Sequence, residues 1–471
     1  MANQDQISQE VLVDRGLIKK YNRAAPRYTS YPTAPHFKGE LVDEAVYCSE
    51  VAQTGEKKTQ RPLSLYIHIP FCQQECYYCG CMRMITKDRS RAEVYLTALY
   101  QEIDRVGELF DKKRPVVQLH FGGGTPTYLN ETQLEELMQK IGQHFQLLSD
   151  DSGDYSIEVD PREVTTGKLH LLRRLGFNRI SFGVQDVNPK VQEAVNRVQP
   201  LEMDIQVFDE ARKAGFKSVN VDLIYGLPHQ TAQTFAATLK TVLTELDPDR
   251  LAVFNFAHLP ELLKNQRKIN ADHLPPPDEK LQILEESIQI LEERGYVYIG
   301  MDHFGKPGDE LTVAQREGKL HRNFQGYTTH AECDLVGLGV SSISQIGNMY
   351  AQNLKMVKEY QERVETGKIP VFRGLIMSAD DQIRHTVIMK LMCNFRLDFA
   401  AIEAQFDLVF EEYFADALQQ LEAMEADGLL AIQNRVIQVS PAGKMLIRNI
   451  CTAFDWYLNQ SQADNRFSQT I

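Results

Sequence analysis

From residue 63 onward, hydrophobic and polar positions repeat one pattern of a short strand, a loop and a helical stretch. Strand-like segments lie at residues 63–69, 116–121, 155–160, 179–184, 218–226 and 250–256. Amphipathic helical patterns fall between them, for example at 92–110 and 132–145. Alternating strands and helices predict a parallel sheet with helices outside it. Six such units are too few for an eightfold barrel, so the sequence predicts an α/β fold built on a partial, open (βα)6 TIM-like barrel.

Five of these strands in succession keep one polar face. Side chains alternate between the two faces of a strand, so that Ile157 and Val159 lie opposite Glu158 and Asp160. Parallel strands that are covered on both faces normally form continuous apolar runs. Single polar positions of this kind are often satisfied core residues, but five polar faces in series predict a barrel interior that is lined for a ligand.

The pattern changes after the sixth strand. Residues 275–304 predict one more helix and strand, whereas residues 321–353 are rich in glycine and polar side chains and are expected to form loops over a site. Helical patterns dominate from residue 380. Residues 428–450 follow the order helix, strand, tight turn, strand and helix, which is typical of a small winged-helix-like domain.

These segments suggest three domains. We expect an N-terminal segment at 1–60 that covers the site, a barrel with substrate loops at 61–370, and a mostly helical C-terminal domain at 371–471.

Composition narrows the class of protein. The chain has 471 residues, of which 43% are hydrophobic, and its formal charge is 51 − 64 = −13. This acidic balance argues against nucleic acid or an anionic membrane as the main partner. The N-terminus lacks the pattern of a signal peptide, and no apolar run is long enough to span a bilayer. We therefore expect a cytoplasmic protein.

Four of the eight cysteines lie within ten residues. The other four, Cys48, Cys333, Cys393 and Cys451, are scattered and are interpreted as small buried hydrophobic residues. A chain of this length with so few cysteines is not a disulfide scaffold. The uneven distribution indicates instead a local site that binds metal or performs redox chemistry.

The cysteine-rich segment directly follows the first strand. Cys72, Cys76 and Cys79 have the spacing C-x3-C-x2-C. Three thiolates can hold three irons of a 4Fe-4S cluster, whereas ferredoxins use four cysteines. The fourth iron is then free to bind S-adenosyl-L-methionine (SAM), which an electron from the cluster cleaves to a 5′-deoxyadenosyl radical. The spacing therefore predicts a radical SAM enzyme.

Three other interpretations of the cysteines remain open. Zinc needs four ligands, which Cys81 and His68 could complete. A C-x2-C redox pair would leave Cys72 unexplained. An iron–sulfur protein that only transfers electrons or acts as a metal scaffold would need neither a polar barrel interior nor a glycine-rich ligand loop. Cys81 itself is either an essential thiol beside the cluster or a packed residue.

A glycine-rich run, HFGGGTPT, ends the second strand at residues 120–127. Glycines allow backbone groups to approach a ligand closely, and barrels bind ligands at the carboxyl ends of their strands. Thr125 and Thr127 add hydroxyl groups near the start of the next helix. We expect this loop to contact the methionyl amino group of SAM.

From residue 27 to the C-terminus the chain resembles the oxygen-independent coproporphyrinogen III oxidases of the radical SAM superfamily. The motifs that carry the resemblance are CYYCGC (76–81), GGGTPTYL (122–129), IEVDPRE (157–163), NRISFGVQD (178–186), NVDLIYGLP (220–228) and HRNFQGYTT (321–329). The first and last of these separate this group from its haem-chaperone and methyltransferase relatives. Another radical SAM enzyme or a haem chaperone of the superfamily is the alternative.

The resemblance implies an oxidoreductase of haem (porphyrin) biosynthesis, a coproporphyrinogen dehydrogenase. The radical would remove a hydrogen from the β-carbon of a propionate, and loss of carbon dioxide and one electron would leave a vinyl group. Two such reactions convert coproporphyrinogen III to protoporphyrinogen IX without oxygen. The expected partners are this substrate, an unidentified reductant for the cluster and an external electron acceptor, and the expected state is a monomer.

The resemblance also implies two bound molecules of S-adenosyl-L-methionine. The first would bind the cluster and contact Tyr66, Gly123 and Glu158. The second would contact Tyr78, Gly124, Thr125, Gln185, Arg197 and Asp222. Ala257 and Ile343 would line the adenosyl pockets. The family often has Phe at the position of Tyr78 and Trp at that of Phe121, and both changes keep an aromatic ring.

The four carboxylates of the substrate require cations or hydrogen-bond donors. Candidates are Arg23, Arg27, Arg322 and Asn323. Each arginine could equally form a structural ion pair, because its guanidinium pairs with carboxylates in both roles.

Overall fold

A computed structural model describes residues 10–39, 41–55 and 60–460. The chain divides into two compact units, each built from separate segments. One, here called the barrel unit, comprises Phe37–Pro275 and Glu332–Ile376. The other, here called the helical unit, comprises Met1–His36, Pro276–Ala331 and Met377–Ile471. Within the described residues, no helix has the length and apolar character needed to cross a membrane.

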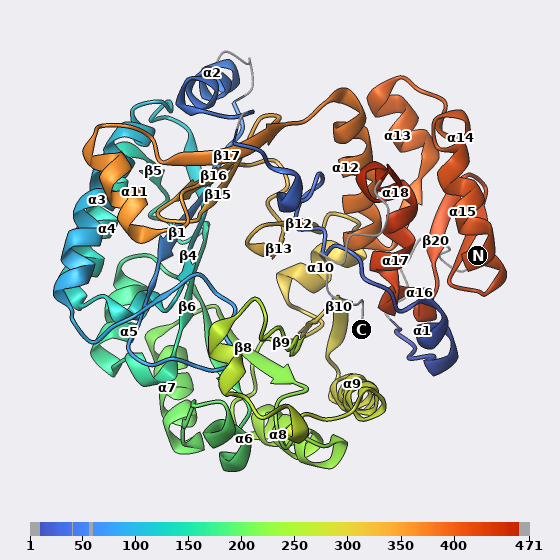
Figure 1. Ribbon diagram of the computed structural model, residues 1–471, viewed down its shortest axis with the longest axis horizontal. Helices are drawn as coiled ribbons and strands as arrows, with labels where there is room; N and C mark the ends of the chain where they lie inside the picture. Colours follow the sequence, from blue (N-terminus) through green and yellow to red (C-terminus); the bar gives the residue numbers. More distant parts are fainter. Residues whose placement is uncertain (1–9, 40, 56–59, 461–471) are drawn as a thin grey trace. The chain divides into compact units, whose positions relative to one another are not determined.

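The barrel unit contains the six predicted parallel strands. They are β1 (Leu63–Ile69), β4 (Pro115–Gly123), β6 (Asp154–Val159), β7 (Arg179–Gln185), β8 (Ser218–Tyr225) and β9 (Arg250–Asn255). Their order in the sheet is β1-β4-β6-β7-β8-β9, and each neighbouring pair is parallel. The crossover helices lie outside the strands (Figure 1). The predicted partial barrel is therefore confirmed.

Local capping explains where several crossover helices begin and end. The helices of the barrel unit are α2 (Glu44–Gly55), α3 (Ser90–Gly107), α4 (Glu131–His144), α5 (Thr166–Arg174), α6 (Pro189–Ala194), α7 (Leu201–Ala214), α8 (Ala232–Glu245) and α11 (Val357–Glu365). Reciprocal hydrogen bonds between Asn130 and Gln133 start α4, and those between Thr231 and Thr234 start α8. Gly215 ends α7 in the left-handed region.

Alternation along the strands separates a buried apolar face from a partly open polar face. In β7, Ile180 and Phe182 are fully buried, whereas Ser181 and Gln185 are only partly buried. In β8, Val221 is buried and Asp222 is partly open. The predicted polar face is thus present.

The prediction of loops for residues 321–353 was wrong for most of this segment. The structure forms the strands β12 (His321–Asn323), β13 (Gly326–Thr328), β14 (Asp334–Leu338), β15 (Ile343–Ile346) and β16 (Met349–Asn353), followed by β17 (Val371–Ile376). Strand β14 pairs with β1 in parallel, and β15, β16 and β17 extend the sheet in antiparallel order.

Strands β14 and β16 lack the alternation that identifies a strand from sequence. Every residue of β14 and β16 is buried, including the polar ones. Those polar groups are satisfied by distant partners: Asp334 forms an ion pair with Arg114 at 2.5 Å, and Asn353 donates to Glu102 at 2.6 Å. Because the partners lie more than 200 residues away in the sequence, polar composition was mistaken for a loop.

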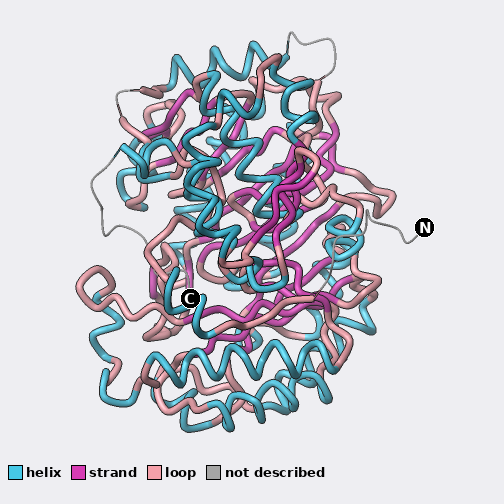
Figure 2. Tube along the Cα trace, turned by 90° about the vertical axis from the view of Figure 1, so that its right-hand side faces the viewer, coloured by secondary structure: helices cyan, strands magenta, loops and turns pink. Residues whose placement is uncertain are grey.

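The helical unit has its own helices and short strands. Its helices are α1 (Arg15–Tyr21), α9 (Pro277–Glu293), α10 (Glu310–Arg316), α12 (Ala379–Asn394), α13 (Phe399–Phe406), α14 (Phe410–Tyr413), α15 (Ala415–Ala426), α16 (Pro441–Met445), α17 (Ile447–Cys451) and α18 (Trp456–Gln460). Besides β12 and β13, its strands are β10 (Val297–Gly300), β11 (His303–Gly305), β18 (Arg396–Asp398), β19 (Leu430–Gln433) and β20 (Val436–Val439). Figure 2 shows how helices, strands and loops follow one another along the trace.

The C-terminal elements confirm the winged-helix-like prediction. Strands β19 and β20 form a hairpin whose two turn residues, Asn434 and Arg435, have φ of 51° and 62°. Two left-handed residues are the requirement of a tight type I′ turn. Strand β18 completes a three-stranded sheet beside helices α13 to α16.

Candidate functional site

The carboxyl ends of the parallel strands bring the predicted site residues to one edge of the sheet. Strand β1 leads into the cysteine loop, here residues 72–81, and β4 leads into the glycine loop, here residues 122–125. Asp160 follows β6, and Gln185 ends β7. In parallel barrels this edge is where ligands bind, so four segments that are far apart in sequence contribute to a single region.

The three cysteines of the motif lie close enough for their thiols to interact. Burial, together with the neighbouring Cys79 and Cys76, raises the pKa of Cys72 to about 12. A hydrogen bond from the thiol of Cys81 lowers the pKa of Cys79 to about 6. Three neighbouring thiolates repel one another unless a cationic group neutralises them. This donor set therefore fits an iron–sulfur cluster that is bound by three cysteines.

Two arginines contact the sulfur of Cys76. Nη1 of Arg197 and Nη2 of Arg162 lie 3.5 and 3.6 Å from its sulfur. Asp160 pairs with the guanidinium groups of Arg197 and Arg162, at 2.9 and 2.7 Å. Burial raises the pKa of the Asp160 carboxyl group, but the two arginines outweigh that effect and lower the pKa to about 2. The two guanidinium groups therefore fix the position of the Cys76 sulfur within the cysteine loop.

Two adjacent side chains fix the backbone of the cysteine loop. Nδ2 of Asn265 donates to the carbonyl oxygens of Tyr77 and Cys79 at 2.8 and 2.9 Å. Nε2 of Gln266 donates to the carbonyl oxygen of Tyr78 at 2.9 Å. Carbonyl groups in the middle of a loop would otherwise point to solvent, so these amides hold the loop in one conformation.

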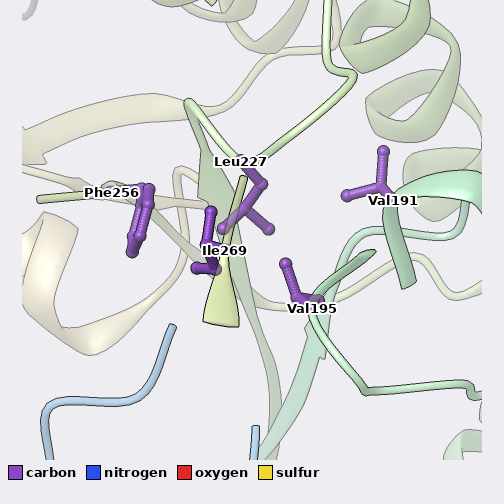
Figure 3. Close-up of a cluster of buried hydrophobic side chains, with 5 residues drawn as sticks. All are labelled: Val191, Val195, Leu227, Phe256 and Ile269. Carbon is purple, nitrogen blue, oxygen red and sulfur yellow. The ribbon is translucent and has the colours of Figure 1, made fainter. Parts of the chain in front are cut away.

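A cluster of buried apolar side chains supports the same loop from behind. It consists of Val191, Val195, Leu227, Phe256 and Ile269 (Figure 3). Tyr77 and Tyr78 pack against it, and the backbone nitrogen of Tyr77 donates to the carbonyl of Val195 at 3.0 Å. The two residues between Cys76 and Cys79 are therefore anchored in the barrel unit, which positions the cysteines on either side.

The glycine loop lies directly against the start of the cysteine loop. The backbone nitrogen of Gly124 donates to Ile69, and that of Thr125 donates to Phe71, at 2.9 and 2.8 Å. A Cβ atom at Gly124 would lie 2.6 Å from the carbonyl oxygen of Phe71. Gly123 has a φ of 122°, which L-residues rarely adopt. Only glycine permits this approach of the two loops.

The residues predicted for the first SAM molecule come together. Tyr66 stacks on His120 with ring centroids 5.8 Å apart, and Nε2 of His120 lies 3.3 Å from Glu158. The backbone nitrogen of Gly123 also donates to Glu158, at 3.3 Å. Although burial acts in the opposite direction, the hydrogen bond from His120 lowers the pKa of Glu158. An ionised carboxylate thus lies beside the glycine loop.

The residues predicted for the second molecule form a neighbouring group. Arg197 donates to the carbonyl of Gly183, and the side chains of Arg197 and Gln185 both lie against that glycine. Burial, together with Glu158, raises the pKa of Asp222 to about 7, and Arg197 is near enough to act in the opposite direction. Arg197 also interacts with Tyr78.

Three other predicted residues occupy the same edge. Oγ1 of Thr125 accepts a hydrogen bond from the backbone of Asp160 at 3.2 Å. Ile343 begins β15 and contacts Gly337, which is paired with Tyr66 across β1 and β14. Ala257 is exposed and follows the carboxyl end of β9. The candidate set is thus distributed around one mouth of the barrel unit.

His68 is engaged elsewhere than at the cysteines. Its Nδ1 is hydrogen-bonded to Oη of Tyr66 and its Nε2 to the carbonyl of Met82, both at 3.0 Å. This arrangement disfavours the four-ligand zinc site that His68 and Cys81 could have completed. Among the residues that the structure describes, no group of three or more His, Cys, Asp or Glu side chains is arranged to hold a single metal ion.

The four candidate substrate ligands lie in the helical unit. Arg23 donates to Oγ1 of Thr452 at 3.2 Å, and Arg27 pairs with Asp302. Arg322 and Asn323 are buried in strand β12.

Sequence reasoning missed the residues that support the cysteine loop. Arg162 lies within a quoted motif, but nothing in the motif predicts its contact with Cys76. Asn265 and Gln266 follow Cys76 by about 190 residues in an irregular segment, so no periodicity or spacing could have indicated them.

Comparisons with known proteins agree with this geometry. Residues 66–242 match the radical SAM superfamily, and residues 377–446 match the HemN C-terminal domain. The oxygen-independent coproporphyrinogen III oxidase of Escherichia coli K12 is 51% identical over 98% of this chain and 99% of its own. The enzyme of the same name from Salmonella typhimurium is 52% identical over the same shares.

A solved structure gives the same result for the fold. Coproporphyrinogen III oxidase from Escherichia coli, a radical SAM enzyme, superimposes with a TM-score of 0.90 at 50% identity and covers 95% of this chain and 100% of its own. With the cysteine loop, the glycine loop and the polar barrel face in place, the chain belongs to the family of the oxygen-independent coproporphyrinogen III oxidases.

Proposed function

We propose that this protein oxidatively decarboxylates two propionate side chains of coproporphyrinogen III to vinyl groups, giving protoporphyrinogen IX without molecular oxygen. The observation that carries the proposal is the three-cysteine loop, which is fixed against a glycine loop at the mouth of a barrel with a polar inner face. Similarity over nearly the whole chain to coproporphyrinogen III oxidases supports the choice of substrate.

The cofactors of the proposed reaction are those of the radical SAM superfamily. When bound, a 4Fe-4S cluster and S-adenosyl-L-methionine supply a 5′-deoxyadenosyl radical. Cys72, Cys76 and Cys79 would hold the cluster. Arg162 and Arg197 orient the sulfur of Cys76, because both donate to it.

Other residues would hold and orient the cosubstrate. Backbone groups of Gly123 and Gly124 are accessible at the glycine loop because they carry no side chain, and Glu158 presents a carboxylate that can accept from an ammonium group or a ribose hydroxyl. Tyr66 covers this region with its aromatic ring. These contacts define the first proposed SAM position.

A second SAM molecule is part of the proposal. Tyr78, Arg197 and Asp222 lie beside the first group without belonging to it, and they combine an aromatic ring, a cation and a carboxyl group. A zwitterionic amino acid moiety requires both signs of charge. Ala257 and Ile343 would line the adenosyl pockets.

The carboxyl group of Asp222 gives the second position a predicted pH dependence. Burial, and then Glu158, raise its pKa to about 7. As the pH falls through this value the carboxylate is protonated and loses its attraction for the cosubstrate's cationic groups. We expect the apparent affinity for SAM to fall about tenfold between about pH 8 and pH 6. Equilibrium titrations of the reconstituted enzyme at several pH values measure this effect.

Asp222→Asn provides the comparison. The variant should bind SAM weakly at every pH and show a flat profile. An unchanged pH profile in Asp222→Asn would assign the dependence to another group.

We also propose the electron donor and acceptor of the reaction, the location of the protein and its oligomeric state. An unidentified reductant supplies the electron for the cluster, and an external acceptor takes the electron left after decarboxylation. A cytoplasmic location is supported by the eight cysteines, all of which are free thiols, as in a reducing compartment. A monomeric state is expected, and light scattering of the reconstituted protein checks it.

A direct assay tests the reaction. Anaerobically reconstituted protein is incubated with coproporphyrinogen III, SAM, a reductant and an acceptor, and porphyrins are separated after oxidation. We expect two carbon dioxide molecules and one protoporphyrinogen IX for each substrate consumed. If an intact cluster cleaves SAM but no vinyl product forms, the substrate assignment is wrong, and haem binding without decarboxylation would favour a chaperone.

A further inference from the structure

Three arginines of the helical unit lie near one another, and one of them, Arg27, pairs with the carboxylate of Asp302. Arg448 of α17 is buried, and its guanidinium donates to the carbonyl oxygens of Pro26, at 3.0 Å, and Ala25. Those contacts fix the backbone next to Arg27, which pairs with Asp302. Arg27, Arg322 and Asp302 all act electrostatically on Arg448.

The positive charges exceed the negative ones within this group. Burial, together with the positive charges of Arg27 and Arg322, lowers the pKa of Arg448 to about 10, whereas Asp302 acts in the opposite direction. Asp302 already accepts from Arg27. The arrangement therefore has capacity for a further anion.

Arg322 is the member of the group that has unused donors. Its side chain comes from the hairpin of β12 and β13, where it is paired with Tyr327 and lies over that ring, 4.9 Å from the centroid. The residue is only 4% exposed. Among the described residues, neither Nε nor Nη1 of Arg322 has a hydrogen-bond acceptor. A buried guanidinium with unpaired N–H groups is costly, and native proteins rarely keep one without a function.

We infer that Arg322, with Arg448 and Arg27 beside it, binds a carboxylate of the porphyrinogen substrate. The planar fork of a guanidinium matches the two oxygens of a carboxylate, and the substrate carries four propionates. The inference rests on the proposed function and adds to it a specific subsite. Arg448 and Tyr327 are additions to the candidates that the sequence indicated.

Equilibrium binding of coproporphyrin III tests the subsite without requiring turnover. This fluorescent tetracarboxylate is titrated into full-length protein, and the dissociation constant is obtained from fluorescence quenching. Arg322→Gln should weaken binding about 10- to 100-fold, the range for loss of a charge-assisted hydrogen-bonded pair. Arg322→Lys keeps the charge but loses the fork, so its affinity should lie between those of Arg322→Gln and the wild type.

Arg435→Gln is the matched control. Arg435 also lies in the helical unit, but its side chain is 48% exposed and pairs with Glu403 and Glu411. This variant should bind coproporphyrin III as the wild type does. Circular dichroism and the thermal midpoint verify folding, and Arg322→Lys carries the test if Arg322→Gln does not fold.

Separate outcomes address the inference and the proposed function. If the wild type binds coproporphyrin III and Arg322→Gln binds within about twofold of it, as expected for an exposed ion pair, the subsite is wrong. It is also wrong if the wild type does not bind the porphyrin, or if the substitution weakens binding of SAM instead, since that would identify the methionyl carboxylate as the ligand. A wild type that binds the porphyrin tightly but forms no vinyl product would overturn the proposed function alone.

Discussion

Replacing Cys72, Cys76 or Cys79 by alanine is expected to abolish the brown iron–sulfur chromophore and SAM cleavage. Each residue is one of three thiols that would bind separate irons, and Arg162 and Arg197 hold the sulfur of Cys76 in place. Loss of one thiolate would leave two of the four irons without a protein ligand. The loss of turnover should be at least about a thousandfold, or about 4 kcal/mol of transition-state stabilisation. Iron content, absorbance and 5′-deoxyadenosine formation measure it.

Two further cysteine variants make this result specific. Cys393→Ala changes a buried thiol of the helical unit and should leave the chromophore intact. Cys81→Ser should also keep the chromophore, because the proposed ligand set does not include it, and its turnover then shows whether that thiol is essential. A full 4Fe-4S signal in Cys76→Ala with loss of signal in Cys81→Ser would exchange the roles of these two residues.

The barrel was predictable because its strands are regular. Each of the central strands has either an apolar run or strict alternation, and the crossover helices begin at recognisable caps such as Asn130 and Thr231. The positions of Glu158 and Asp222 on one face followed from the same alternation. Alternation does not say which residues of neighbouring strands lie side by side. The strand register supplies this, because it places Glu158 beside Ser181 and Asp222 beside Gly183.

Elements that depend on distant partners were not predictable. Strand β14 is satisfied by an ion pair to Arg114, and β16 by the carboxylate of Glu102. Asn265 and Gln266 look like ordinary loop residues until the fold brings them to the cysteine loop. The domain boundaries proposed at residues 60 and 370 stay a prediction. Each compact unit joins segments that are far apart in the sequence, so its limits do not follow from the order of elements along the chain.

Gly124→Ala is expected to disrupt the cluster site without removing any ligand. The added Cβ would lie 2.6 Å from the oxygen, and 2.9 Å from both the carbonyl carbon and the nitrogen, of Phe71. These are backbone atoms that cannot rotate away, and Phe71 directly precedes Cys72. Relief of the contact must separate the glycine loop from the cysteine loop, at a cost of about 1–3 kcal/mol. Iron incorporation and SAM cleavage should each fall at least about tenfold, which corresponds to about 1.4 kcal/mol.

Gly142→Ala is the control variant, because it is expected to stabilise the fold whereas Gly124→Ala is expected to destabilise it. Gly142 lies on the exposed side of helix α4, and the nearest atom to its added Cβ is 3.9 Å away. Alanine there should raise the free energy of unfolding by about 0.5–1 kcal/mol and leave iron content unchanged. Denaturation monitored by circular dichroism, together with iron analysis, separates the two variants. If Gly124→Ala incorporated iron and cleaved SAM as the wild type does, the close contact of the two loops would not position the cluster, and the other contacts of the cysteine loop, including those of Asn265 and Gln266, would be sufficient to hold it.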